Sequence, residues 1–281
     1  MKRIAFISDL FRGDLLGGAE SNDHNLIKHL SQQFTVISYK SNEIAIKDIE
    51  QSDFVIVSNF VLLSEEVKAY LIKSGSYIIY EHDHKYLRTR DPSKFVAFKA
   101  PTDQLINEGF YSQAKAVVVL SEICKKVLER NIPDAHVHNI ACSLWSDQTF
   151  ELLARLSDTP KEHEYCIMRN LNPTKNYHQT VEFCNARNIQ PVEIHSPTYH
   201  YFLTQMSGCR KFVFLPTVLE TFSRICAEAK MLNLQVMTNK NLIGFFSENY
   251  STLQGSVLIE KLREKNKTAL KYFTNIVLEN T

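Results

Sequence analysis

The sequence predicts an α/β protein built from two doubly wound domains. Short apolar runs alternate with helix-like stretches over the first half of the chain, and the alternation returns in the second half after a polar segment. Near-continuous apolar strands separated by helices indicate parallel sheets that are covered on both faces. The 281 residues, 44% of them hydrophobic, are enough for two such domains of modest size.

The first domain is expected at residues 1–145. Five strands are predicted there from short apolar, β-branched or aromatic runs, at 3–7, 35–38, 54–57, 77–80 and 116–120. Helix-like stretches are expected between strands, at 19–30, 65–73 and 121–130. Ser121 directly before Glu122 is typical of a helix start after a strand.

The second domain is expected at residues 160–255, after linker material from residue 141 to residue 162 that includes a polar helix ending near residues 157–160. Strands are predicted at 165–168, 191–194, 211–215 and 235–238. Helices are predicted at 175–187 and 223–232. In the tail, residues 256–281, apolar side chains recur on one helical stripe, which indicates that the last helix packs on the rest of the protein.

Charge, hydropathy and cysteine content exclude several classes of protein. The 32 Lys and Arg residues nearly balance the 31 Asp and Glu residues, so the net charge does not require a nucleic-acid or membrane partner. No stretch approaches the roughly eighteen apolar residues of a membrane span, and the run after Met1 is too short for a signal peptide. The six cysteines have no zinc spacing and are expected to be reduced. We therefore expect a cytoplasmic protein.

Gly17 and Gly18 stand together in a sequence that has only eight glycines. They follow the first expected strand and precede a helix. Glycine lets backbone N–H groups approach a ligand closely, and a helix start adds unpaired N–H donors and the positive end of the helix dipole. A tight turn explains the pair equally well, because the G-x-G-x-x-G spacing of dinucleotide sites is absent.

Two carboxylates, Glu220 and Glu228, lie eight positions apart after the strand expected at 211–215. If Glu220 began a helix, the two would be roughly 10–12 Å apart along its axis, too far to flank one glycosidic bond as the carboxylates of a hydrolase do. They would suit the two ends of an extended ligand, with a phosphate at the helix-start N–H groups near Phe222 and Ser223. The alternative is that Glu220 is a solvent-facing glutamate that caps the helix and Glu228 is an ordinary surface glutamate.

These residues resemble a known family. The spacing of Glu220 and Glu228 is similar to the Glu-x7-Glu pattern of retaining GT-B glycosyltransferases, especially glycosyltransferase family 4. Gly17-Gly18-Ala19-Glu20 resembles the glycine-rich loop of that group, and Val119-Leu120-Ser121-Glu122 is similar to a phrase of its nucleotide-sugar enzymes. The resemblance extends over both halves of the chain. It implies two Rossmann-like domains that face a cleft, with the C-terminal helix, at 256–281, returning to the first domain.

The resemblance also implies roles for residues of the second domain. Glu228 would hold the ribose of the donor nucleotide, and Glu220 would hold the sugar hydroxyls. Lys175 matches the lysine that stabilises the donor diphosphate, whereas Asn170 stands where the family usually has an arginine. Because the loss of a cation at a leaving group raises the barrier substantially, we expect the neighbouring Arg169 to supply the second charge.

A polar segment after the strand expected at 77–80 holds two histidines, His82 and His84, beside acidic residues. Clustered His, Asp and Glu residues are potential metal ligands, but the resembling fold needs no metal because Lys and Arg neutralise the diphosphate. The family has an active-site histidine near this place, and we favour His84 over His82. The first domain would thus bring its glycine pair and His84 to the transferred sugar.

The same segment continues into a basic loop with interleaved aromatic residues. From residue 81 to residue 99, five Lys or Arg residues accompany three acidic ones. Such a loop would suit a phosphate-bearing acceptor, DNA included. A solvated loop without that role has the same composition.

The sequence therefore predicts a nucleotide-sugar-dependent hexosyl- or pentosyltransferase that retains the anomeric configuration. A UDP-sugar is the favoured donor and co-substrate, with no metal and no further cofactor. The favoured acceptor is a hydroxyl of a saccharide, free or lipid-linked. The protein is expected to have no integral membrane contact and to act in the cytoplasm of a bacterium or of an infected host cell. The alternatives are a phage-type enzyme that glycosylates hydroxymethylated bases in DNA and an inactive nucleotide-sugar-binding homologue.

Overall fold

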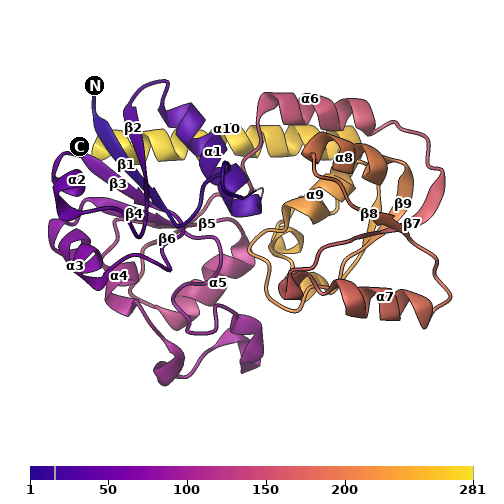
Figure 1. The fold of residues 1–281 in the computed structure, drawn as a ribbon, viewed down its shortest axis with the longest axis horizontal. Coiled ribbons are helices and arrows are strands. Elements are labelled where there is room, and N and C mark those ends of the chain that lie inside the picture. Colours follow the sequence, from indigo (N-terminus) through magenta and orange to yellow (C-terminus); the bar gives the residue numbers. More distant parts are fainter. Residues whose placement is uncertain (16, 281) are drawn as a thin grey trace. The chain divides into compact units, whose positions relative to one another are not determined.

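The computed structural model describes residues 1–15 and 17–280. The chain forms two compact units, one of Met1–Trp145 together with Lys265–Thr281 and the other of Ser146–Glu264. Each unit contains one sheet whose paired strands are all parallel, with helices on both faces (Figure 1). The predicted fold class, two doubly wound α/β domains, is confirmed.

The first unit has a six-stranded sheet in the order β2-β1-β3-β4-β5-β6. Its strands are β1 (Arg3–Ser8), β2 (Thr35–Lys40), β3 (Phe54–Val57), β4 (Tyr77–Tyr80), β5 (Val117–Val119) and β6 (Val137–Asn139). The strands β1, β3, β4 and β5 are almost wholly buried, which explains their continuous apolar runs. The strand order reverses between β1 and β3, and open parallel sheets bind ligands beyond the carboxyl ends of their strands at such a point.

Helices cover both faces of this sheet. Those of the first unit are α1 (Gly18–Leu30), α2 (Ile46–Glu50), α3 (Glu65–Ser74), α4 (Glu108–Ser112), α5 (Glu122–Asn131) and the C-terminal part of α10 (Gly255–Glu279). Right-handed crossovers place α1 on the face opposite to α2, α3 and α5. Three short 3₁₀ helices, η1 (Pro92–Lys94), η2 (Val96–Phe98) and η3 (Thr102–Gln104), lie in the loop after β4.

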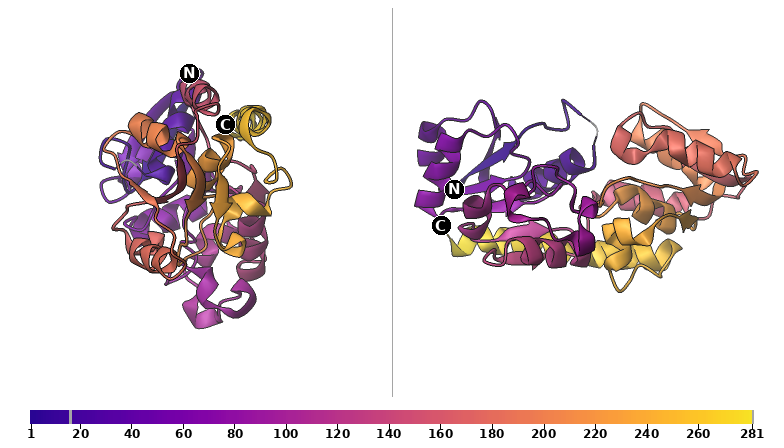
Figure 2. Two further views of the ribbon diagram at one scale, coloured as in Figure 1. Left: turned by 90° about the vertical axis from the view of Figure 1, so that its right-hand side faces the viewer. Right: turned by 90° about the horizontal axis from the view of Figure 1, so that it is seen from below.

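The long helix α10, yellow in Figures 1 and 2, packs against α1 and β4 of the first unit. The His29 ring lies 3.1 Å from the Thr274 hydroxyl, and the ring centroids of Tyr80 and Phe273 are 5.0 Å apart. The prediction that the last helix returns to the first domain is therefore confirmed. None of the helices in the described residues has the length and apolar composition of a membrane span.

The second unit has a four-stranded sheet in the order β8-β7-β9-β10, so its strand order also reverses, between β7 and β9. The strands are β7 (His163–Met168), β8 (Val192–Ile194), β9 (Cys209–Val213) and β10 (Gln235–Met237). Its helices are α6 (Asp147–Leu156), α7 (Tyr177–Asn185), α8 (Tyr199–Ser207), α9 (Arg224–Met231) and the first part of α10. Loops contain the 3₁₀ helices η4 (Pro173–Lys175), η5 (Lys240–Leu242) and η6 (Gly244–Ser247).

The boundaries predicted from the sequence lie within two residues of those observed for each expected strand and helix. The sequence does not predict α2, α4, β6 or α8. β6 is a half-buried edge strand of three residues, too short for a clear pattern. α8 is rich in aromatic residues and begins where the Thr198 hydroxyl accepts the Tyr201 N–H, so a cap rather than helix propensity defines its start.

Candidate functional site

Lys175 and Glu220 form an ion pair where the strand order of the second unit reverses. Lys175 ends η4 in the loop after β7, and Glu220 lies in the loop after β9. The Lys175 Nζ atom is 2.6 Å from the Glu220 Oε1 atom, and both side chains are mostly buried. The Asn172 carboxamide stiffens the loop by accepting the Thr174 N–H at 3.0 Å. Two predicted site residues that are 45 positions apart are therefore in contact.

Glu220 does not begin a helix, contrary to the assumption behind the spacing argument. Helix α9 begins at Arg224. Glu220 instead pairs with the segment after β10: its N–H donates to the Leu242 carbonyl and its carbonyl accepts the Gly244 N–H, both at 2.9 Å. Because this pairing replaces a first helical turn, the axial distance calculated for a continuous helix does not describe the separation of Glu220 and Glu228.

Glu228 lies within α9 and is only 2% exposed. The Tyr199 hydroxyl donates to its Oε1 atom at 2.5 Å, and the Arg224 Nε atom lies 3.5 Å from the same oxygen. Burial, followed by the negative charge of Glu228, raises the pKa of Tyr199, so the phenol stays a hydrogen-bond donor. Two neighbours thus fix the orientation of this carboxylate.

The turn that enters α9 contains Phe222 and Ser223. Ser223 has left-handed backbone, with φ 65°, and its side chain makes no capping hydrogen bond to the first turn. The Phe222 carbonyl accepts the Phe245 N–H at 2.8 Å, which anchors the turn. Arg169 follows β7 directly and is exposed, and among residues 1–15 and 17–280 it forms no ion pair with Glu220 or Glu228.

The first unit has a buried polar network at its own reversal of strand order. Asp23 of α1 is fully buried and accepts a hydrogen bond from the Ser8 hydroxyl at 3.1 Å. It also accepts the Ser58 hydroxyl at 2.8 Å. The His82 Nε2 atom lies 3.1 Å from the Asp23 Oδ1 atom. The network therefore joins α1 to the segments that end β1, β3 and β4, and the sequence does not predict Asp23.

Glu20 extends this polar region into the first turn of α1. Burial raises the pKa of its carboxyl, and the nearby charge of Asp23 adds to the rise. A Cβ atom on Gly17 would overlap the Glu20 carboxylate, so the backbone at Gly17 is closely covered, whereas Gly18 begins the helix and is exposed. Glu20 and Asp23 lie on the buried side of α1 together with Leu26. Two acidic residues at positions where a helix packs on the core are the sequence signal that would have revealed this network.

His84 does not join Asp23. Its backbone is left-handed, with φ 59°, and its Nδ1 atom lies 2.9 Å from the Tyr86 hydroxyl. Asp83 contacts Lys85 and Arg90 instead. His82, Asp83 and His84 thus face different partners, and the part of the chain that the structure describes contains no group of three His, Cys, Asp or Glu residues suited to a metal ion.

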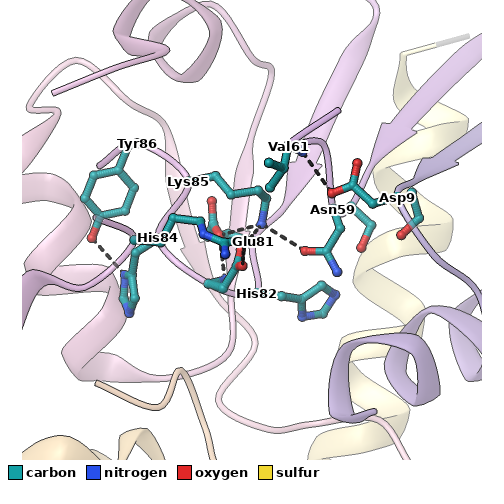
Figure 3. Close-up of polar contacts among 12 residues, drawn as sticks. Asp9, Asn59, Val61, Glu81, His82, His84, Lys85 and Tyr86 are labelled. Carbon is teal, nitrogen blue, oxygen red and sulfur yellow. Dashed lines mark hydrogen bonds and ion pairs between the residues drawn. The ribbon is translucent and has the colours of Figure 1, made fainter. Parts of the chain in front are cut away.

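A buried ion pair, Glu81 and Lys85, lies between the two histidines (Figure 3). The Lys85 Nζ atom is 3.0 Å from Glu81 Oε1 and 3.1 Å from Asn59 Oδ1. Burial favours a high pKa for Glu81, but the Lys85 charge and the hydrogen bond from Tyr111 outweigh it and lower the pKa to about 2. Against the effect of burial, Asp83 and Glu81 raise the pKa of Lys85. This pair stabilises the loop that carries both histidines.

Comparison with known proteins reveals similarity in structure. No protein-family model and no curated protein matches the sequence. An α-glucosyltransferase in complex with UDP-glucose and DNA containing an abasic site aligns at a TM-score of 0.50 and 12% identity, over 99% of each chain. HepE from Anabaena, in complex with UDP and glucose, aligns at 0.51 and 13% identity, over 100% of this chain and 93% of that one. The UDP-N-acetylglucosamine 2-epimerase from Rickettsia bellii aligns at 0.55 and 12% identity, over 99% and 96%.

These neighbours define the class of fold to which the chain belongs. The chain has the GT-B fold, with two Rossmann-like units, each built on its own parallel sheet. At identities of 12% to 13% the likeness shows the fold alone. Membership of glycosyltransferase family 4 and the roles of the Glu-x7-Glu residues stay predictions.

Proposed function

We propose that the protein is a retaining glycosyltransferase that moves a hexose or pentose from a UDP-sugar to a hydroxyl of a saccharide. The observation that carries the proposal is the contact of Lys175 with Glu220 at the strand-order reversal of the second unit. Both residues lie in the loops where such a sheet binds ligands. Solved structures that share the fold and contain UDP or UDP-glucose support a UDP-linked donor.

Glu228 is the proposed ligand of the ribose. An ionised carboxylate accepts two hydrogen bonds at once, which suits a pair of neighbouring ribose hydroxyls. Tyr199 and Arg224 hold the carboxylate in one orientation. The nucleoside therefore meets a fixed acceptor, and less conformational entropy is lost on binding.

Lys175 is the proposed ligand of the diphosphate, and Glu220 that of the sugar hydroxyls. The two groups are in contact at 2.6 Å. A cation that faces the diphosphate and a carboxylate that accepts from the sugar hydroxyls would therefore lie side by side, where the diphosphate joins the sugar. Arg169 and the N–H groups of Phe222 and Ser223 supply further donors. Negative charge builds on the diphosphate as its bond to the sugar breaks, so fixed cations lower the barrier. We propose that these cations and N–H donors take the place of a metal ion.

The first unit is proposed to serve the acceptor. Gly17 and Gly18 line the approach to the sugar, and a histidine of the segment after β4, His84 or His82, contacts the transferred group. The segments that follow the carboxyl ends of β1 and β4 supply these residues, and ligands bind at this edge of such a sheet.

Calorimetric titration with UDP tests the donor site. UDP is expected to bind, and Glu228→Gln should weaken binding about 10- to 100-fold, because a charged hydrogen bond contributes about 1.5–3 kcal/mol. Glutamine still accepts from Tyr199, so the fold should survive. The matched control is Glu151→Gln, which changes an exposed glutamate of α6 in the same unit. Equal UDP affinity in the wild type and in Glu228→Gln would refute the assignment.

A screen of donors against acceptors, read by mass spectrometry, tests the reaction. Lys175→Ala should lower kcat by about 10²–10³-fold, the usual effect of removing one group that stabilises transition-state charge. Turnover should persist in excess chelator. UDP binding without transfer to any acceptor would indicate the inactive homologue, and conversion of the donor sugar without an acceptor would indicate an epimerase.

One loop of the first unit favours DNA as a second candidate acceptor. Val96 is 92% exposed and lies between two exposed lysines, Lys94 and Lys99. The Asn131 carboxamide braces the loop by donating to the Phe98 carbonyl at 2.8 Å. An exposed apolar side chain with basic neighbours suits a DNA groove. A hydroxymethylated duplex therefore belongs in the screen, and salt-dependent duplex binding would favour it over a saccharide.

A further inference from the structure

Asp23 is the most deeply buried carboxylate of the first unit. Its side chain is fully shielded from solvent, and it accepts hydrogen bonds from Ser8 and Ser58, with His82 as its third partner. These partners belong to segments at the carboxyl ends of three neighbouring strands. Burying a carboxylate away from solvent costs free energy unless the group is paired and hydrogen-bonded. Asp23 lies at the edge of the sheet where ligands are expected to bind, so its contacts are relevant to that site.

The chemistry of these partners fixes the state of the His82 ring. The Ser8 and Ser58 hydroxyls donate to Asp23, and the third described contact of this carboxylate is with a ring nitrogen of His82. An ionised carboxylate only accepts hydrogen bonds. The Nε2 atom of His82, at 3.1 Å from Asp23, must therefore carry a proton. In the neutral ring this leaves Nδ1 as the hydrogen-bond acceptor.

His84 has a different kind of described contact. The group at its Nδ1 atom is the Tyr86 hydroxyl, at 2.9 Å, which is able either to donate or to accept. The contact with a hydroxyl is compatible with either tautomer of His84, whereas the contact of a carboxylate with His82 is compatible with only one neutral tautomer. In Figure 3 the two rings lie on opposite sides of the Glu81 and Lys85 pair, with His84 turned toward Tyr86.

We propose that Asp23 is a positioning residue that holds His82 as the Nε2–H tautomer, so that its Nδ1 atom accepts a hydrogen bond from a hydroxyl of the sugar substrate. This rests on the proposed glycosyltransferase function and selects His82 over His84 as the histidine of the site. Asp23 itself touches no substrate. It acts by fixing which nitrogen of His82 donates and which accepts.

Asp23→Asn is the decisive variant, because it keeps the shape of the side chain. The amide nitrogen facing His82 donates, so Nε2 must accept and the proton moves to Nδ1, where it blocks the proposed contact. We expect kcat to fall about 10- to 100-fold, as when a residue that orients an active-site ligand is lost. UDP affinity should not change. The double variant Asp23→Asn/His82→Gln should be no slower than His82→Gln alone, since both changes remove one interaction.

Ser58→Ala is the control for a structural role. It removes a buried hydrogen bond from the same carboxylate but leaves the contact with His82, and it should keep most of the activity. If Ser58→Ala were as slow as Asp23→Asn, or if the double variant were slower than His82→Gln alone, the inference would be wrong while the proposed function stands. Absence of transfer by the wild type would instead refute the proposed function.

Nitrogen-15 NMR of the histidine rings tests the tautomer without any activity. In the wild type we expect the proton of His82 on Nε2, and in Asp23→Asn on Nδ1, with His84 unchanged. A wild-type His82 that carries its proton on Nδ1 would overturn the proposal. This measurement on the unmodified protein decides the question even if Asp23→Asn does not fold.

Discussion

Glu20 is a residue whose buried charge opposes folding. Burial raises the pKa of its carboxyl above that in the unfolded chain, so the folded state binds a proton more tightly than the unfolded state does. Stability therefore falls as the pH rises from the unfolded pKa through the raised folded pKa, and the full penalty is present above the folded pKa. We expect Glu20→Gln to be more stable than the wild type at pH 7, with the difference vanishing near pH 4.

Urea unfolding of both proteins at the two pH values measures this effect. Glu66→Gln, at an exposed position of α3 in the same unit, is the control and should change stability by no more than about 0.5 kcal/mol. If Glu20→Gln destabilised the protein at pH 7, the buried carboxylate would instead be held by favourable contacts. A gain in stability with a loss of activity would assign Glu20 to the site.

Single residues also show where sequence reasoning stops. Glu228 and His82 are predicted because each lies in a recognisable segment of the sequence. Their partners are not, because Tyr199 reaches Glu228 from another helix, 29 positions away, and Asp23 reaches His82 over 59 positions. A contact of that kind depends on how strands and helices are ordered in space, which a local pattern does not encode.

At the scale of elements, two histidines secure α10 on the first unit. His29 contacts Thr274 at 3.1 Å, and His138 stacks on Tyr272 with ring centroids 3.6 Å apart. Burial lowers the pKa of both histidines, so the unfolded state binds protons more readily. Their contribution to stability is full above the unfolded pKa, near 6.5, and is lost as the pH falls through the lowered folded pKa.

We therefore expect α10 to loosen from the first unit under mild acid. Hydrogen exchange of residues 265–279, corrected for the intrinsic effect of pH, should accelerate between pH 7.5 and pH 5. The variant His29→Gln/His138→Phe, which keeps an aromatic ring on Tyr272 and removes both titrations, should lose most of this acceleration. Equal acceleration in the variant and the wild type would assign the effect to other groups.

Helices and strands could be predicted where their burial produces a recognisable pattern of apolar residues in the sequence. Strands β3 and β4 are buried on both faces, and their apolar runs give the observed ends. Helix α2 has five residues and β6 has three, so neither contains a full period of its own. Glu220 shows a further limit, because its pairing with the chain after β10 depends on a tertiary contact.

At the scale of the whole molecule, the two units share one feature of their sheet topology. Both sheets reverse their strand order beside the first strand of the unit. Each reversal holds a contact between two polar side chains, Asp23 with His82 in the first unit and Lys175 with Glu220 in the second. The alternation of strands and helices predicts the two sheets, but not which residues gather at the reversals. Each unit has a buried core of its own, so the two are expected to respond separately to a ligand.

UDP should therefore stabilise the second unit selectively. A ligand at about 100 times its Kd stabilises the state that binds it by about 2.7 kcal/mol, which corresponds to about a 100-fold slowing of exchange through unfolding. We expect hydrogen exchange with UDP to slow in β7, β9 and α9, and not in β1, β3 and β4. Glu228→Gln should remove most of this protection at the same UDP concentration. Protection centred on the strands of the first unit would place the nucleotide there, and the assignment of Lys175 and Glu228 to the donor would be wrong.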